Sequence, residues 1–146
     1  MGKSLRTIAW RGGIGLGLLL LVLTRFAQAA GPTSTTIVTA TLDADGVQRA
    51  TLILDSYSFD PSHLMAQVNK PVELTLKNVS TLAPHNFKLD SATAGLYVSG
   101  NTKAGQTAIV RFTPTKPGVF EFYCDKKLAF LPSHRDKGMV GKLEVR

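Results

Sequence analysis

The chain has 146 residues, of which 17 are basic and 10 acidic, giving a formal net charge of +7 at pH 7. It contains a single cysteine, which excludes an intramolecular disulfide framework. Its basic residues form no cluster interleaved with aromatic residues, as a nucleic-acid-binding surface would require. We therefore predict that nucleic acid is not a partner.

Residues 1–29 have the pattern of a secretory signal peptide. Three basic residues precede an apolar run at 14–23, and small residues follow up to Ala29. The apolar run is short compared with the roughly 20 residues that span a bilayer. The alternative is an uncleaved N-terminal anchor, and membrane contact is expected only in that case. Both interpretations predict that the folded part is periplasmic or otherwise exported from a bacterial cell.

The first 29 residues contain four of the basic side chains, so the rest of the chain carries a net charge of only about +3. Residues 30–36 are small and polar, and we predict that they form a flexible start. Residues 37–146 are long enough for one domain with a single hydrophobic core.

The sequence beyond residue 36 has the residue pattern of short β-strands. Residues 71–79 show it well, because Val72, Leu74 and Leu76 alternate with polar residues. Residues 91–101 are predicted to be a loop with at most one brief turn or strand, and no segment shows a helical period. An all-β sandwich or barrel with seven or eight strands follows. The predicted strands lie at 35–43, 47–59, 63–68, 71–79, 85–90, 106–114, 119–125 and 139–146.

The lone cysteine, Cys124, closes one of these strands. In an exported protein it is a buried thiol, half of an intermolecular disulfide, or a metal ligand. His85 begins another strand, and His134 and Met139 follow Cys124 on the next loop. A β-sandwich can bring such strand ends and a loop together at one end. Two imidazoles, a thiolate and a weak thioether are the donors of an electron-transferring blue copper site, whereas zinc would not use methionine.

The segments that hold these residues resemble the cupredoxin family, which includes plastocyanin, azurin and pseudoazurin. The similar region runs from about residue 57 to 146. It contains, in order, FDPSHLMAQVNKPVELTLKNV, PHNF, AGQTAIVRFTPTKPGVFEFYC, an H-x4-M spacing and GMVGKLEV. The resemblance implies an antiparallel Greek-key β-sandwich of seven or eight strands, formed by a single domain at 37–146.

The same resemblance implies one copper ion that cycles between Cu(I) and Cu(II). His85 and His134 would be its imidazole ligands, Cys124 its thiolate ligand and Met139 its axial ligand. Asn86 would connect the two ligand-bearing segments by hydrogen bonds.

The loop between Cys124 and His134 is longer than in small cupredoxins. It has nine residues, DKKLAFLPS, and resembles in length the loop in the copper domain of copper nitrite reductases. Its apolar stretch at 128–132 is expected to fold back over the metal end of the core or to form an apolar docking patch around His134, and the two arrangements are compatible. Basic residues flank this stretch and would attract an acidic partner.

The resulting functional prediction is an exported carrier of single electrons, whose redox partner is a c-type cytochrome or a membrane oxidase. The alternative is a periplasmic copper-binding or copper-tolerance protein, because a long loop would loosen His134. We do not expect an enzyme. Nitrite reductase chemistry needs a second copper ion bound by further histidines, and only His63 remains. A binuclear copper centre is also excluded, because it needs two cysteines and the chain has one.

Overall fold

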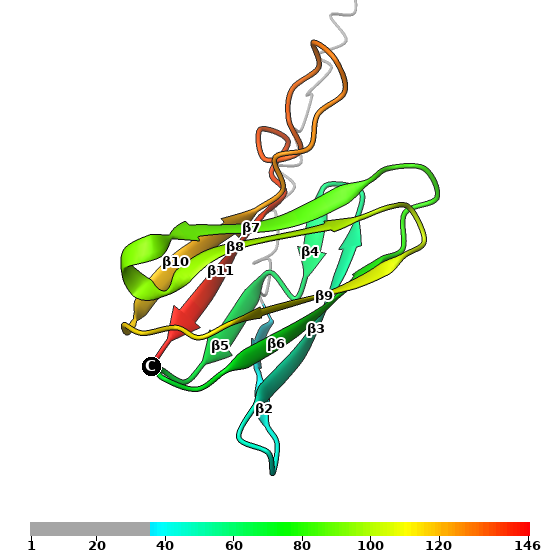
Figure 1. Ribbon diagram of the computed structural model, residues 1–146. Helices are drawn as coiled ribbons and strands as arrows, with labels where there is room; N and C mark the ends of the chain where they lie inside the picture. Colours follow the sequence, from blue (N-terminus) through cyan, green and yellow to red (C-terminus); the bar gives the residue numbers. More distant parts are fainter. Residues whose placement is uncertain (1–35) are drawn as a thin grey trace, which may run out of the picture. The chain divides into compact units, whose positions relative to one another are not determined.

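The computed structural model of the protein describes residues 36–146, which form two β-sheets that pack face to face (Figure 1). The predicted signal peptide or anchor at 1–29, and residues 30–35 of the predicted flexible start, lie outside the described residues. Within residues 36–146 the one helical element is a short 3-10 turn, η1 (Ala92–Ala94). In this part of the chain no helix has the length and apolar character needed to cross a membrane.

The first sheet has six strands and the second has five. The order in the first sheet is β1 (Ile37–Thr39), β5 (His63–Ala66), β11 (Val140–Val145), β10 (Gly118–Tyr123), β7 (His85–Ser91) and β8 (Leu96–Thr102). The order in the second sheet is β2 (Thr41–Leu42), β3 (Gln48–Asp55), β6 (Val72–Asn78) and β9 (Thr107–Phe112), and β4 (Ser58–Asp60) pairs with β3.

The inward faces of both sheets form one hydrophobic core. Val72, Leu74 and Leu76 of β6 are buried, as their alternation predicts. At the centre of the core the ring of Phe122 lies 5.1 Å from the ring centroids of both Phe59 and Phe87. Because Phe122 precedes Cys124 by two residues, this aromatic cluster anchors the end of β10.

The all-β class is confirmed, but the strand count and pairing differ from the prediction. Residues 36–146 contain eleven strands, and the pairs β1–β5, β5–β11 and β3–β6 are parallel, so the sheets are mixed rather than antiparallel. Strands β4 and β5 separate β3 from β6 along the chain. This crossing between the sheets lets β3 and β6 run in the same direction.

Two local predictions also fail. The predicted strand at 47–59 is a hairpin, β3 and β4, that turns at Ser56 and Tyr57. The predicted loop at 91–101 contains β8, which pairs with β7 along seven residues. Residues 96–102 include Ser, Gly and Asn, which have low strand propensity, and pairing with a neighbouring strand overrides this preference.

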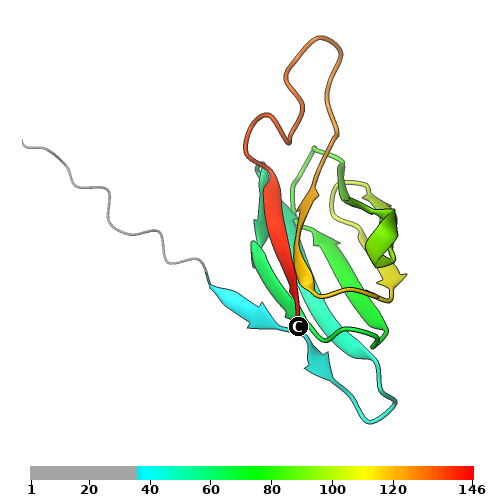
Figure 2. The ribbon, with the colours of Figure 1, turned by 90° about the vertical axis from the view of Figure 1, so that its left-hand side faces the viewer.

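The segment between β10 and β11, residues 124–139, projects beyond one end of the sandwich (orange in Figures 1 and 2). β7 begins at this same end, because β7 and β10 are adjacent and antiparallel. The C-terminus lies at the opposite end. Cys124, His134 and Met139 therefore all belong to the projecting segment, and His85 lies beside its base.

Candidate metal centre

Three of the four predicted metal-binding side chains converge at this end of the sandwich. Within residues 36–146, one group of metal-binding side chains has its donor atoms within 4.8 Å of one another: His85, Cys124 and His134. The Nδ1 atoms of His85 and His134 are 3.1 Å apart. The Sγ atom of Cys124 lies 4.0 Å from Nδ1 of His85 and 3.5 Å from Nδ1 of His134.

Backbone hydrogen bonds in the projecting segment place the histidine and the methionine next to the cysteine. The N–H of His134 donates to the carbonyl of Lys126, and the N–H of Met139 donates to the carbonyl of His134. The N–H of Cys124 in turn donates to the carbonyl of Met139 at 3.1 Å. Ser133 and Asp136 exchange side-chain and backbone hydrogen bonds around the turn that carries His134. The Met139 side chain is fully buried.

Asn86 connects the two ligand-bearing segments, as predicted. Its side-chain NH2 donates to Oδ1 of Asp125 at 2.7 Å, and its side-chain oxygen accepts from the N–H of Asp125 at 3.0 Å. Its own backbone N–H points at Sγ of Cys124, 3.3 Å away. This N–H favours the thiolate over the thiol, because it stabilises negative charge on sulfur.

Burial controls the protonation of the group. It lowers the pKa of His85, and the neighbouring His134 lowers that pKa further. Burial, assisted by the charge of Lys137, also lowers the pKa of His134. Burial raises the pKa of the Cys124 thiol, opposed by the backbone N–H groups of Asn86 and Lys126. At neutral pH and without metal, both imidazoles are therefore neutral and the thiol is protonated, so a metal ion would displace one proton.

The donor group fits a single copper ion. At most one proton can lie between the two Nδ1 atoms, so nitrogen and sulfur lone pairs remain directed inward in a buried space. Imidazole nitrogen and thiolate sulfur bind first-row metals at about 2.0–2.1 and 2.3 Å. All three observed separations are shorter than the sums of those bond lengths, so one ion can contact all three atoms. Two imidazoles and one thiolate are the donor set of type 1 copper.

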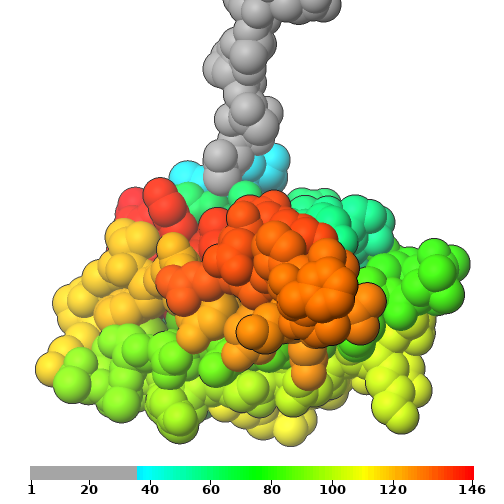
Figure 3. Space-filling view, turned by 90° about the horizontal axis from the view of Figure 1, so that it is seen from above, coloured from blue at the N-terminus to red at the C-terminus, as the bar shows by residue number. Residues whose placement is uncertain are grey.

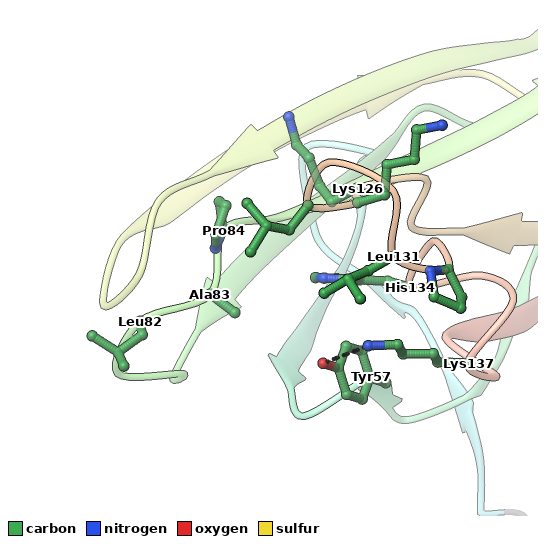
Figure 4. Close-up of a pocket in the computed structure, with 11 residues that line it drawn as sticks. Tyr57, Leu82, Ala83, Pro84, Lys126, Leu131, His134 and Lys137 are labelled. Carbon is green, nitrogen blue, oxygen red and sulfur yellow. Dashed lines mark hydrogen bonds between the residues drawn. The ribbon is translucent and has the colours of Figure 1, made fainter.

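His134 is the donor residue that approaches the surface. His85 and Cys124 are completely buried, whereas His134 is 9% exposed and lines a pocket of about 380 Å³. Figure 4 shows the pocket between the β6–β7 loop, with Leu82, and the projecting segment, with Leu131. Figure 3 looks onto this end of the molecule, where the projecting segment (orange) lies over the strand ends.

The apolar stretch at 128–132 is exposed, so it does not fold back over the core. Phe130 is 96% exposed, and Leu82 on the other side of the pocket is 91% exposed. Leu131 and Pro132 form part of the pocket wall. Of the two arrangements predicted for this stretch, the structure has the exposed one.

The charged residues around the pocket are mostly basic. Lys126, Lys127 and Lys137 line it, and no carboxylate does. Within residues 36–146 none of these three lysines forms an ion pair. Arg135, by contrast, is paired with Glu121. The pocket therefore has an apolar wall and a positive rim.

One residue at this site, Tyr57, is not predicted from the sequence. Its ring lies edge-on to the imidazole of His134, with 4.9 Å between ring centroids. It falls near the end of the predicted strand at 47–59, although the polar pair Asp55-Ser56 inside an apolar run is a turn signal. No sequence pattern connects Tyr57 with His134, because the two meet only when the sheets pack.

The two-sheet frame and the His/Cys/His group at its loop end define a type 1 copper protein. A family model described as a cupredoxin-like domain matches residues 16–140. The chain belongs to this cupredoxin-like family.

Among curated proteins, the chain is similar to a copper-containing nitrite reductase of Alcaligenes xylosoxydans xylosoxydans. The two are 38% identical over 77 residues, which cover 51% of this chain and 23% of that protein. The chain therefore matches under a quarter of the length of this relative.

Two solved structures share the fold. One is the metal-binding domain of the Cu(I)-exporting P-type ATPase CopA of Streptococcus pneumoniae D39, at 21% identity and a TM-score of 0.61, covering 77% of this chain and 97% of that one. The other is a reduced auracyanin of Roseiflexus castenholzii, at 19% identity and a TM-score of 0.56, covering 73% of this chain and 98% of that one.

Proposed function

We propose that the protein is an exported carrier of single electrons, with one copper ion bound by His85, Cys124, His134 and Met139. The observation that carries this proposal is the shape of the donor group. Its sulfur and one imidazole are sealed in the core, and the other imidazole reaches a surface pocket. Such a group lets an electron enter or leave through His134 while water stays away from the thiolate.

The chain's own residues would supply the rigidity that a carrier needs. His85 belongs to a strand, and Cys124 is hydrogen-bonded through its N–H to Met139. Bound copper supplies the one-electron couple. A frame that imposes one compromise geometry on both oxidation states keeps rearrangement small, so electron exchange can be fast.

Met139 is proposed as the axial ligand. Its side chain is fully buried, and its backbone is bonded on one side to His134 and on the other to Cys124. A methionine held between two ligands in this way has little freedom to leave the site. A weak thioether donor completes the donor set of type 1 copper.

We propose that the redox partner docks over the pocket with an acidic surface. The apolar residues of the pocket wall would exclude water around His134, and Lys126, Lys127 and Lys137 would attract carboxylates. A c-type cytochrome or a membrane oxidase in the exported compartment is the partner class that this surface suits.

Copper binding or copper tolerance is the second candidate function. The observation that favours it is the exposed stretch at 128–132 beside a pocket that leads to His134, through which an ion could be exchanged. Against it, the backbone of His134 is held by hydrogen bonds to Lys126 and Met139. Electron transfer therefore ranks first.

We propose no enzymatic activity for the chain, although the curated relatives are enzymes. Reduction of nitrite would need a second copper ion and further histidines. Besides His85 and His134 the chain has only His63, whose Nε2 lies 3.2 Å from a carboxylate oxygen of Glu144.

The test is a visible absorption spectrum recorded while Cu(II) is added to the protein, with Cys124→Ser as the control. An intense thiolate-to-copper band that saturates at one equivalent, and is absent from Cys124→Ser, is expected. Voltammetry should then give a reversible one-electron wave. A band with no reversible wave, or with copper lost on reduction, would favour the copper-binding candidate. Absence of the band would overturn both the ligand assignment and the carrier.

A further inference from the structure

The turn between β3 and β4 has an unusual backbone. Its two central residues, Ser56 and Tyr57, both have positive φ angles, of 38° and 67°. Two-residue hairpin turns with this conformation strongly prefer Asn and Gly, because a side chain at positive φ crowds the backbone. A tyrosine at this position is therefore unfavourable for the turn itself, and backbone strain of this kind is found most often at functional sites.

The Tyr57 ring contacts both His134 and Lys137. Its edge-on contact with His134 has an interplanar angle of 80°. The ammonium group of Lys137 lies 4.4 Å from the centre of the same ring and donates a hydrogen bond to the Tyr57 hydroxyl at 3.1 Å (dashed in Figure 4). A contact of this kind between a cation and an aromatic face is attractive.

The imidazole of His134 needs such support. Within residues 36–146 its hydrogen-bonding contacts are those of Nδ1 with the donor group, and Nε2 has no protein partner. In metal centres the second ring nitrogen of a ligand histidine is usually bonded, which fixes the ring orientation. Packing can also fix the orientation of a ring, and Tyr57 supplies an aromatic contact to His134 from the other sheet.

We propose that Tyr57 is a positioning residue for the metal centre. Its ring, backed by Lys137, holds the His134 imidazole toward Cys124 and compensates for the long loop on which His134 sits. This inference rests on the proposed function, in which His134 binds copper. The inference gives the β3–β4 turn a role in holding His134. This role explains why a tyrosine stands at a position with positive φ, where the turn itself would favour Asn or Gly.

The test compares Tyr57→Asn with Ser56→Asn. Asn suits positive φ, so neither variant should unfold more easily than the wild type. Copper release to a chelator should be about three- to tenfold faster in Tyr57→Asn, the range expected from one lost aromatic contact. Ser56→Asn changes the same turn without touching the His134 contact, and should release copper at the wild-type rate. Tyr57→Phe keeps the ring and should stay within about twofold of wild type.

Lys137→Met leaves the turn untouched and provides a second measurement if Tyr57→Asn fails to fold. Removing the ammonium group from the ring face should speed copper release by about two- to threefold. The proposal is overturned if Tyr57→Asn releases copper at the wild-type rate. If Tyr57→Asn does not fold, release at the wild-type rate by Lys137→Met overturns it. It is also overturned if Ser56→Asn accelerates release as much as Tyr57→Asn, because relaxation of the turn would then be the cause.

A measurement without metal separates this inference from the proposed function. In the metal-free wild type, nuclear Overhauser contacts between the Tyr57 and His134 rings are expected, and the His134 ring signals should broaden or shift in Tyr57→Asn but not in Ser56→Asn. Absence of these contacts overturns the positioning role even if the copper band is present. Their presence without a copper band supports the positioning of His134 and overturns the copper assignment alone.

Discussion

At the residue scale, the centre depends on side chains that do not themselves reach the donor atoms. Asn86 makes two hydrogen bonds to Asp125 and so joins the start of β7 to the end of β10. Its side chain is nearly buried, so water cannot easily replace these bonds.

Replacing Asn86 with alanine should lower the free energy of unfolding of the metal-free protein by about 1–3 kcal/mol, because the N–H of Asp125 loses its partner. Urea unfolding followed by far-ultraviolet circular dichroism measures the change. The control is Asn101→Ala, which removes the exposed residue opposite Asn86 on β8 and should stay within about 0.5 kcal/mol of wild type. Equal effects of the two substitutions would contradict the bridging role of Asn86.

Met139→Leu tests the axial ligand at the same scale. Leucine has a similar volume, so the cost in unfolding free energy should be below about 1.5 kcal/mol. The reduction potential should rise, because loss of a donor destabilises Cu(II) more than Cu(I) in a buried apolar site. Voltammetry of both proteins measures the shift. An unchanged potential and an unchanged absorption band would show that Met139 is only a core residue.

The donors could be predicted from the sequence because their residue types and their order along the chain can be read from it directly. The types His, Cys, His and Met and the strand pattern around them indicate one metal site. Hydrogen bonds of Asn86 between the two ligand-bearing segments were expected from the family resemblance, but its partner Asp125 and the position of Tyr57 were not. The position of Tyr57 depends on a turn that falls inside a predicted strand, and on the packing of one sheet against the other.

At the element scale, β11 is the central support of the site. It lies between β5 and β10 and pairs with β10 along its whole length. Gly141 of β11 stands opposite Phe122, and a Cβ atom at this position would overlap the Phe122 ring. The glycine thus lets the aromatic cluster pack directly beneath the donor group.

Gly141→Ala should lower the free energy of unfolding by about 1–3 kcal/mol, because the added methyl group overpacks the core against Phe122 and the carbonyl of Ser62. The urea midpoint should fall while the denaturant slope stays constant. Lys142→Ala, on the exposed face of the same strand, is the control and should change stability by less than about 0.5 kcal/mol. A midpoint for Gly141→Ala equal to that of the control would contradict the predicted overlap.

Elements were predictable where one face alternates, as in β6, and were not where turns interrupt an apolar run. β3 and β4 merged into one predicted strand because Ser56 and Tyr57 lack the Asn or Gly that marks such a turn. The parallel pairing of β3 with β6 was also missed. Pairing direction depends on how the chain crosses between the sheets, and local alternation carries no information about that crossing.

At the scale of the whole molecule, lysines without an ion pair within residues 36–146 lie at both ends of the sandwich. Lys126 and Lys127 line the pocket beside His134 and have no acidic partner among residues 36–146. Lys70 and Lys116 are also exposed, but they precede β6 and β10 and so lie at the opposite end of the sandwich. The two pairs allow the position of charge to be tested at constant net charge.

Reversing Lys126 and Lys127 to glutamate should slow reduction by the anion hexacyanoferrate(II) by about tenfold at low salt, because attraction at the pocket becomes repulsion. The cation hexaammineruthenium(II) should react faster with the same variant. Stopped-flow absorbance measures both rates, and added salt should reduce both effects. The double variant Lys70→Glu/Lys116→Glu carries the same net charge and should show much smaller changes. Equal slowing by the two double variants would mean that net charge, not the pocket, controls the rate.

The end of the sandwich that holds the β2–β3 turn contains a pH-sensitive ion pair. A hydrogen bond from Arg49 and another from the N–H of Val47 lower the pKa of Asp45 from 3.8 to about 2. Because the folded pKa lies below the unfolded one, the carboxylate stabilises the fold above pH 3.8, and this contribution disappears as the pH falls toward 2.

The urea midpoint of Asp45→Asn should therefore lie below that of wild type at pH 6, and the difference should shrink between pH 4 and pH 2. Asp60→Asn removes an exposed carboxylate that has no ion pair within residues 36–146, and serves as the control. A difference between Asp45→Asn and wild type that is constant from pH 6 to pH 2 would contradict the assignment.

The position of β11 also sets an order of assembly. His85 is fixed by β7, but Cys124, His134 and Met139 are tied together by bonds that close only where β11 begins. If β7 and β10 pair before β11 is in place, the loop has no second anchor, and His134 and Met139 are not held beside Cys124. We therefore expect firm metal binding only after β11 has inserted between β5 and β10, so the unfolded chain offers copper no complete site.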